Sequence, residues 1–233
     1  MSLTLLHLSD PHLDGGEDRA ERLRAVLDLM PTSRRPDAIV VTGDVADHGT
    51  DAEYVQFRDI MADRGPWLAV PGNHDDPAHF GNDGPVTALD LDGLRIIGID
   101  VTVPGEDHGE LRSEVADLAA ERAAGAAVTV LALHQPPITI GHGYIDPMNL
   151  RNPDALAALA ARIGTVTAIL CGHAHTAGAT VFAGVPLLLA PGIVSSLRPD
   201  PDHRPLTNRD LPPGAALHRF TGGTVTTTFH YAG

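Results

Sequence analysis

The sequence predicts an α/β fold in which two β-sheets carry helices on their outer faces. The first third of the chain alternates apolar strands with amphipathic helices, and the part from Ala179 onward reads as β, with strands joined by turns and one long loop. Nearly continuous apolar strands between amphipathic helices are typical of a mainly parallel sheet that is covered on both faces. We assign residues 1–233 to one domain, because no repeat, low-complexity tract or linker interrupts the pattern.

Composition and charge limit the classes of function. The 233 residues are 43% hydrophobic and 20% charged, which suits a globular protein with a sizeable core. The net charge of −14 argues against duplex nucleic acid or an anionic membrane as a partner, but bound cations can still attract a small phosphorylated substrate. The single cysteine, Cys171, rules out an intrachain disulfide. With no signal-peptide pattern and no long apolar run, we expect a cytoplasmic protein.

Strands and helices alternate along the first part of the chain. Apolar runs predict three strands, at residues 3–9, 37–42 and 67–70. Helical spacing of apolar residues predicts a helix over residues 18–29, between the first two strands. Thr50 and Glu53 form a capping box at the start of a second helix, before the third strand.

The rest of the chain adds a hairpin, two helices and further strands. Asp92-Gly93 is a strong hairpin signal between residues 86–91 and 94–100. Helices are predicted over residues 113–124 and from Asn152-Pro153 to residue 162, where Asn supplies the cap and Pro the first helical position. The remaining apolar runs predict strands at residues 128–133, 166–171, 179–182, 185–190, 215–220 and 224–229. We interpret the Pro-rich residues 197–213 as a long loop.

Five of the predicted strands end in side chains that bind metals. These seven side chains are Asp10, His12, Asp44, Asn73, His134, His173 and His175, and His74 directly follows Asn73. Residues i and i+2 of an extended or turning backbone can point the same way, so Asp-x-His and His-x-His can each reach one ion. Sites in parallel sheets lie outside the carboxyl ends of the strands. Nitrogen and oxygen ligands without a thiolate suit Zn, Mn, Fe or Co, and seven ligands are about right for two ions that share a carboxylate.

A single histidine such as His12 or His134 would by itself be interpreted as a structural residue, because a lone histidine is more often structural than a ligand. The histidines outside the strand ends and the cysteine are interpreted in this way. We expect His7 to lie in the core or at a sheet edge, and Cys171 to be buried as an apolar residue. Four further histidines lie in polar loops and are expected to be exposed: His48, His79, His108 and His142. A second acidic cluster is interpreted as a solvated turn: Asp200, Asp202 and His203.

The complete series of strand-end motifs resembles that of the calcineurin-like metallophosphoesterases. Its five blocks occur in order as Asp10-x-His12, Gly43-Asp44, Gly72-Asn73-His74-Asp75, His134 and Gly172-His173-x-His175. The sequence around three of these blocks is similar to the bacterial class III cyclic-nucleotide and glycerophosphodiester phosphodiesterases. Gln135 stands where that group more often has a second histidine.

The resemblance implies a four-layer αββα sandwich, two mixed β-sheets flanked by helices, with a dinuclear metal site at the strand ends. It implies that the first ion is held by Asp10, His12, Asp44 and His175. It implies that the second ion is held by Asp44, Asn73, His134 and His173, with Asp44 bridging the two. His74 would face the substrate rather than a metal, and Asp47 would hydrogen-bond His74 and orient it.

The implied activity is that of a metal-dependent phosphodiesterase, in which a metal-bridging hydroxide attacks a small phosphodiester in line. We place a 3′,5′-cyclic nucleotide such as cAMP ahead of a glycerophosphodiester. A phosphomonoesterase or a nucleotide pyrophosphohydrolase is the alternative, and a non-catalytic metal-binding adaptor is disfavoured because every ligand and His74 are kept. Loops 141–151 and 197–213 are expected to frame the pocket, and a monomer and a homodimer both fit the sequence.

Overall fold

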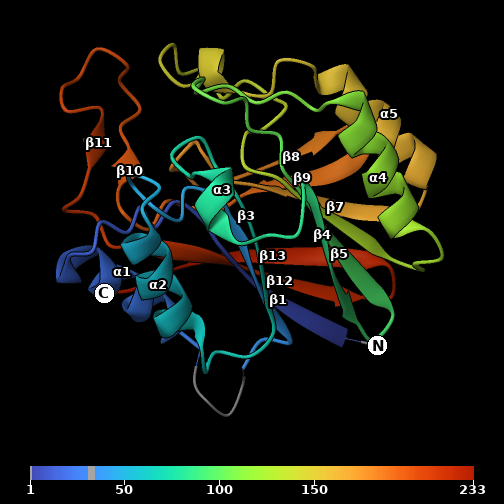
Figure 1. Cartoon of the computed structure of the whole chain (residues 1–233), viewed down its shortest axis with the longest axis horizontal. Coiled ribbons are helices and arrows are strands. Elements are labelled where there is room, and N and C mark those ends of the chain that lie inside the picture. Colours follow the sequence, from blue (N-terminus) through green and yellow to red (C-terminus); the bar gives the residue numbers. More distant parts are fainter. Residues whose placement is uncertain (1, 31–34) are drawn as a thin grey trace.

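Two mixed β-sheets face each other in the computed structural model of the protein, which describes residues 2–30 and 35–233 (Figure 1). In spatial order, the first sheet consists of β13 (Thr224–Tyr231), β12 (Gly214–Thr221), β1 (Ser2–Leu8), β2 (Ala38–Thr42) and β3 (Trp67–Val70). Strands β1, β2 and β3 run parallel to one another, whereas β12 is antiparallel to both of its neighbours.

The second sheet is also parallel in its centre and antiparallel at its edges. In spatial order, its strands are β4 (Val86–Leu91), β5 (Leu94–Ile99), β6 (Thr129–Ala132), β7 (Val166–Cys171), β9 (Val185–Leu189) and β8 (Gly178–Phe182). The four central strands are parallel, and hairpins attach β4 and β8 at the two edges. As a result, the carboxyl ends of β6 and β7 lie next to each other.

Helices cover the outer face of each sheet. Helices α1 (Glu17–Leu27) and α2 (Asp51–Met61) pack against the first sheet, and α4 (Ser113–Ala123) and α5 (Pro153–Ile163) pack against the second. A third apolar cluster lies between the sheets, with Leu5, Val40 and Leu68 from the first sheet and Ile96, Val130 and Leu170 from the second. These three cores confirm the predicted αββα sandwich. No helix among the described residues is long and apolar enough to cross a membrane.

Most predicted elements are present within one or two residues of their expected ends, and the capping box is confirmed because the Thr50 N–H donates to Glu53 at 2.9 Å. Four short elements of the described structure were not predicted. They are α3 (Pro77–Phe80), the 3₁₀ helix η2 (Asp146–Met148) and the strand pair β10 (Ser196–Leu197) and β11 (Thr207–Asn208). The strand pair forms within the predicted long loop, where too few residues pair to leave a periodic pattern.

Two buried histidines form a hydrogen-bonded chain across the first sheet. The His7 Nε2 atom lies 2.8 Å from Thr42 Oγ1, and its Nδ1 lies 3.1 Å from His218 Nε2. The other ring nitrogen of His218 lies 2.9 Å from Thr227 Oγ1. His7 is therefore a core residue, as expected. Burial lowers the pKa of His218 to about 3, and burial together with the charge of His218 lowers the pKa of His7 well below its ordinary value.

We expect the free energy of unfolding to decrease as the pH is lowered from about 6.5 to 4.5. Unfolded histidine binds a proton near pH 6.5 while the buried pair stays neutral, so the unfolded state holds more protons in this window. Each histidine contributes a slope of about 1.4 kcal/mol per pH unit. Denaturant unfolding at several pH values should show a smaller slope for His218→Gln than for wild type. The difference should equal the contribution of one histidine, because glutamine does not titrate. Equal slopes in the two proteins would contradict the prediction.

Candidate metal centre

The strand-end side chains predicted to form the site meet where the carboxyl ends of the parallel strands of both sheets lie together. They follow β1 (Asp10, His12), β2 (Asp44), β3 (Asn73, His74), β6 (His134) and β7 (His173, His175). The sheets are joined at this edge, because His134 Nδ1 donates to the carbonyl of Thr42 at 2.6 Å. The Asp10 N–H also donates to the carbonyl of Gly43 at 3.1 Å, which ties the ends of β1 and β2 together.

Asp44 lies between two groups of ligands. Its Oδ2 atom is 3.4 Å from His12 Nε2 and 3.3 Å from His134 Nε2. On one side, His12 groups with Asp10 and His175, and Asp10 Oδ1 is 3.5 Å from His175 Nε2. On the other side, Asp44 groups with His134 and His173, and Asn73 Oδ1 is 3.2 Å from His134 Nε2. The structure thus brings the residues of both implied ligand sets together around Asp44, and it also groups the exposed His74 with His12 and Asp44.

Left-handed backbone turns present five of these residues to the site. The residues with positive φ, between 45° and 66°, are Asp10, His12, Asp44, His173 and His175. Among the described residues, Ala183 is the one other non-glycine with positive φ. Such conformations cost on the order of 1–3 kcal/mol each and persist only where the surrounding structure enforces them. The strained backbone is therefore concentrated at this one edge of the fold.

Two motif glycines let the turns approach each other. A Cβ on Gly72 would lie 2.2 Å from Asp44 Oδ1, and a Cβ on Gly43 would lie 2.3 Å from His134 Nδ1. Gly43 also has φ +89°, which a residue with a side chain rarely adopts. Each glycine therefore makes room for a ligand that comes from a different strand.

Several buried polar atoms of the site lack a partner within the described part of the chain. Asp10 Oδ2, His12 Nε2 and His173 Nε2 make no hydrogen bond there. Leaving such atoms unpaired is costly, and native proteins rarely do so. Cations held by carboxylate oxygens and imidazole nitrogens would satisfy them, and this donor set suits first-row transition metals. The residues present therefore fit a dinuclear metal centre.

The charges of the site are strongly coupled. Burial alone would raise the pKa of Asp44, but the neighbouring His134 and His12 hold it well below its ordinary value. Burial opposes the protonation of His134, yet the carboxylates of Asp44 and Asp10 raise its pKa to about 9. Burial and the charge of His134 lower the pKa of His173 to about 3. Because a ligand imidazole must be neutral, His134 has to release a proton when a cation binds.

Hydrogen bonds from the outer ring nitrogens orient the ligand histidines. His12 Nδ1 donates to Asp47 Oδ1 at 3.0 Å, and His175 Nδ1 donates to the carbonyl of Ser195 at 3.1 Å. With His134 Nδ1 donating to Thr42, all three rings turn Nε2 toward the centre. Such outer contacts fix the tautomer and increase the basicity of the ligand nitrogen.

The expected hydrogen bond between Asp47 and His74 is formed by the backbone of Asp47 and not by its carboxylate. The Asp47 carboxylate instead accepts from His12 and from Arg19, whose Nη1 lies 2.8 Å from Oδ2, and both contacts lower the pKa of Asp47. His74 Nδ1 donates to the backbone carbonyl of Asp47 at 3.0 Å. His74 is exposed, its N–H donates to Asp44 Oδ1 at 2.9 Å, and its ring stands edge-on to His12. His74 is thus oriented by the Asp47 backbone, not by its side chain.

Asp75 has a larger structural role than its place in the motif suggested. Its carboxylate accepts hydrogen bonds from the N–H groups of Val45, Ala46 and Gly72, and from the Tyr54 hydroxyl at 3.1 Å. Burial and the nearby Asp44 raise the pKa of Asp75 to about 6. Asp75 fastens the turn after β3 to the turn after β2, which holds Asn73 beside Asp44.

Two of the four loop histidines are not exposed as expected. His48 and His79 are exposed, but His108 and His142 are buried by loop packing that brings together residues distant in sequence. Cys171 is buried, as predicted. The second acidic cluster is a solvated turn: Asp200, Asp202 and His203 are exposed, and no candidate metal group within the described chain includes them.

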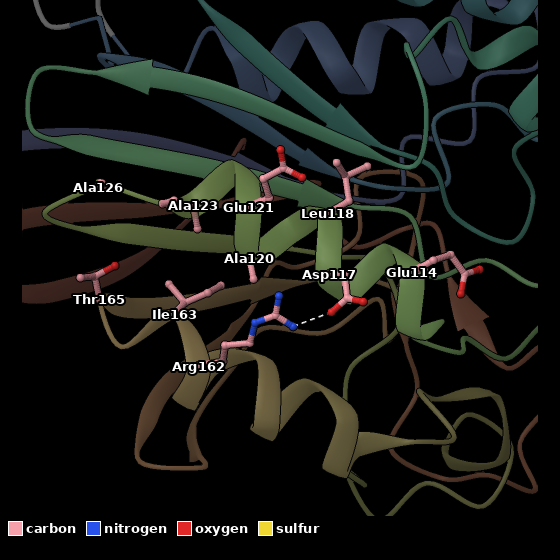
Figure 2. Close-up of a pocket in the computed structure, with 12 residues that line it drawn as sticks. Glu114, Asp117, Leu118, Ala120, Glu121, Ala123, Ala126, Arg162, Ile163 and Thr165 are labelled. Carbon is pink, nitrogen blue, oxygen red and sulfur yellow. Dashed lines mark hydrogen bonds and ion pairs between the residues drawn. The ribbon is translucent and has the colours of Figure 1, made fainter.

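One large cavity of the described structure has none of the candidate metal ligands in its lining. This groove of about 640 Å³ lies between α4 and α5, where Arg162 and Asp117 form an ion pair at 2.6 Å (Figure 2). Exposed carboxylates such as Glu114 and Glu121 line it, and no histidine does. The groove offers none of the buried, unpartnered ligand atoms that mark the metal centre.

Fold and site together define a metal-dependent hydrolase with a dinuclear centre between two sheets. The sequence profile of the family described as calcineurin-like phosphoesterase matches residues 3–177. The chain belongs to this family, which confirms the resemblance seen in the motifs. Calcineurin-like phosphoesterases are metal-dependent phosphoesterases that use a dinuclear metal centre.

Individual relatives agree with this membership. The chain is 40% identical over 210 residues to a cAMP/cGMP dual specificity phosphodiesterase of Mycobacterium tuberculosis, covering 80% of this chain and 66% of the relative, just under two thirds of its length. It is 31% identical to a glycerophosphodiester phosphodiesterase of Enterobacter lignolyticus, covering 94% of this chain and 88% of the relative. A dimetal phosphatase from Danio rerio has the same fold, with a TM-score of 0.68 at 13% identity over 99% of each chain.

Proposed function

We propose that this protein hydrolyses small phosphodiesters, with a 3′,5′-cyclic nucleotide such as cAMP ahead of a glycerophosphodiester. The observation that carries the proposal is the buried ligand set around Asp44 with the exposed His74 beside it. Two of the relatives reported above are named as phosphodiesterases, one for cyclic nucleotides and one for glycerophosphodiesters.

We propose the following roles. The first ion is held by Asp10, His12, Asp44 and His175, and the second by Asp44, Asn73, His134 and His173. Mn, Fe, Zn or Co fits these ligands. When bound, the two ions supply Lewis acidity and positive charge for an anionic phosphate.

His74, at the exposed rim, donates a proton to the leaving oxygen. Asp47 is a positioning residue, because its carboxylate orients His12 and its carbonyl orients His74.

Metal removal combined with a substrate panel tests the proposal. The panel contains bis-p-nitrophenyl phosphate, cAMP, glycerophosphocholine, p-nitrophenyl phosphate and a nucleotide pyrophosphate. We expect chelation to abolish diester hydrolysis, and readdition of one transition metal to restore it with about two ions per chain by elemental analysis. Full activity in the stripped protein would overturn the proposal. Preference for p-nitrophenyl phosphate or the pyrophosphate would favour the alternative reactions within this family.

A further inference from the structure

A second cavity, of about 480 Å³, lies next to the segment that follows His175 and has a size typical of ligand sites. One wall includes Thr176, which follows His175, and Leu197, whose N–H donates to the carbonyl of His175 at 3.0 Å. The other walls come from residues 138–142 and from the paired strands β8 and β9. We call this cavity the side pocket.

The lining of the side pocket is largely apolar and carries no negative charge. Its large apolar side chains are Ile138, Ile140, Leu187, Leu189 and Leu197. No carboxylate and no phenylalanine, tyrosine or tryptophan is among its described lining residues. The pocket therefore suits an uncharged group with flat apolar faces.

Two polar groups of the lining are left without partners. His142 is only 4% exposed, and neither of its ring nitrogens has a hydrogen-bond partner within the described chain. The buried Nε of Arg198 is also unpartnered there. A neutral imidazole offers one donor and one acceptor on ring nitrogens that point in different directions, so His142 can form one hydrogen bond to a donor or an acceptor of a ligand in the pocket.

These features separate the two substrate types considered above. The choline head of a glycerophosphodiester is best held by aromatic faces or carboxylates, which the lining lacks, and the guanidinium of Arg198 would repel it. A purine base has flat apolar faces, and adenine presents a ring-nitrogen acceptor beside an amino donor. Sites that bind extruded bases combine such edge hydrogen bonds with apolar contacts to the ring.

We propose that the side pocket binds the purine base of a cyclic nucleotide, with His142 hydrogen-bonded to the edge of the base. This rests on the phosphodiesterase function proposed above. The base then lies in the pocket next to His175 while the phosphate lies at the metal centre. The pocket thereby determines which diester the protein prefers.

The decisive variant is His142→Leu, which keeps the volume and removes both hydrogen-bonding atoms. We expect its KM for cAMP to increase by about tenfold or more, with kcat changed by less than about twofold. Hydrolysis of glycerophosphocholine, which has neither a base nor an aromatic ring, should stay within about twofold of wild type, and the metal content should be unchanged. The matched control is His203→Leu, at an exposed histidine outside the side pocket, which should behave as wild type.

A binding measurement with adenosine tests the pocket without catalysis. Adenosine has no phosphate, so we expect it to raise the unfolding midpoint of the metal-loaded wild type but not that of His142→Leu. Equal cAMP kinetics in His142→Leu and wild type, or an equal loss with both diesters, would overturn the pocket proposal. If wild type hydrolyses neither diester, the proposed function fails, while the adenosine result still supports or overturns base binding.

Discussion

Asp44→Ala is expected to abolish phosphodiester hydrolysis, with a loss of about 10³-fold or more in kcat/KM. Asp44 is common to both ligand groups, with Oδ2 within 3.4 Å of His12 and His134. Its removal takes away the carboxylate that both proposed ions share, and even outer contacts to metal ligands typically cost about 10–100-fold. Elemental analysis of the purified variant should find both ions depleted, in parallel with the lost turnover.

The control for Asp44→Ala is Asp59→Ala, which removes an exposed carboxylate from α2. This variant should keep wild-type activity and metal content. Circular dichroism and denaturant unfolding of the metal-free proteins would separate lost metal binding from lost folding. An Asp44→Ala protein that retained two ions and substantial turnover would contradict the shared-ligand assignment.

His74→Ala is expected to retain both ions but to lose about 10²–10⁴-fold in kcat for cAMP. His74 is exposed beside the ligand groups and is held by the carbonyl of Asp47, a geometry suited to proton donation to a leaving oxygen. Donation matters most for a poor leaving group. The loss should therefore be much smaller with bis-p-nitrophenyl phosphate, whose phenolate leaves readily.

Two comparisons sharpen the His74 experiment. Asn73→Ala should instead reduce occupancy of the second ion, so the two neighbours separate catalysis from metal binding. His79→Ala removes an exposed histidine from α3 and should leave both substrates unaffected. Equal losses on both diesters in His74→Ala would rule out its role as a proton donor, and a drop in metal content would make His74 a ligand.

The sequence predicted the sheets, and it predicted that the candidate ligands lie close together, for a common physical reason. Buried parallel strands are apolar along their whole length, so the ends of β1, β2 and β7 are visible as abrupt changes to Asp and His. Parallel neighbours in one sheet must bring those ends together. At this edge, the local sequence pattern and the arrangement of the strands therefore predict the same site.

The sequence was less informative where distant segments determine the environment. His142 lies in a polar, glycine-rich stretch, which predicts exposure, but β8, β9 and the segment around Arg198 enclose it. The carboxylate of Asp47 forms an ion pair with Arg19. This contact joins a helix to a loop, and the spacing of residues in the sequence does not predict it. Such packing depends on tertiary arrangement, and the periodicity of a single segment does not record it.

The left-handed turns at Asp10, His12, Asp44, His173 and His175 have a consequence for protein engineering. Copying these five side chains onto the strand ends of another scaffold would not reproduce the centre, because an ordinary strand end would aim them elsewhere. A successful graft would have to include the turns themselves. It would need Gly43 and Gly72, where a Cβ would clash with a neighbouring ligand, and Asp75, whose hydrogen bonds hold two of the turns together. The unit that can be transplanted is thus a set of interlocked loops rather than a list of ligands.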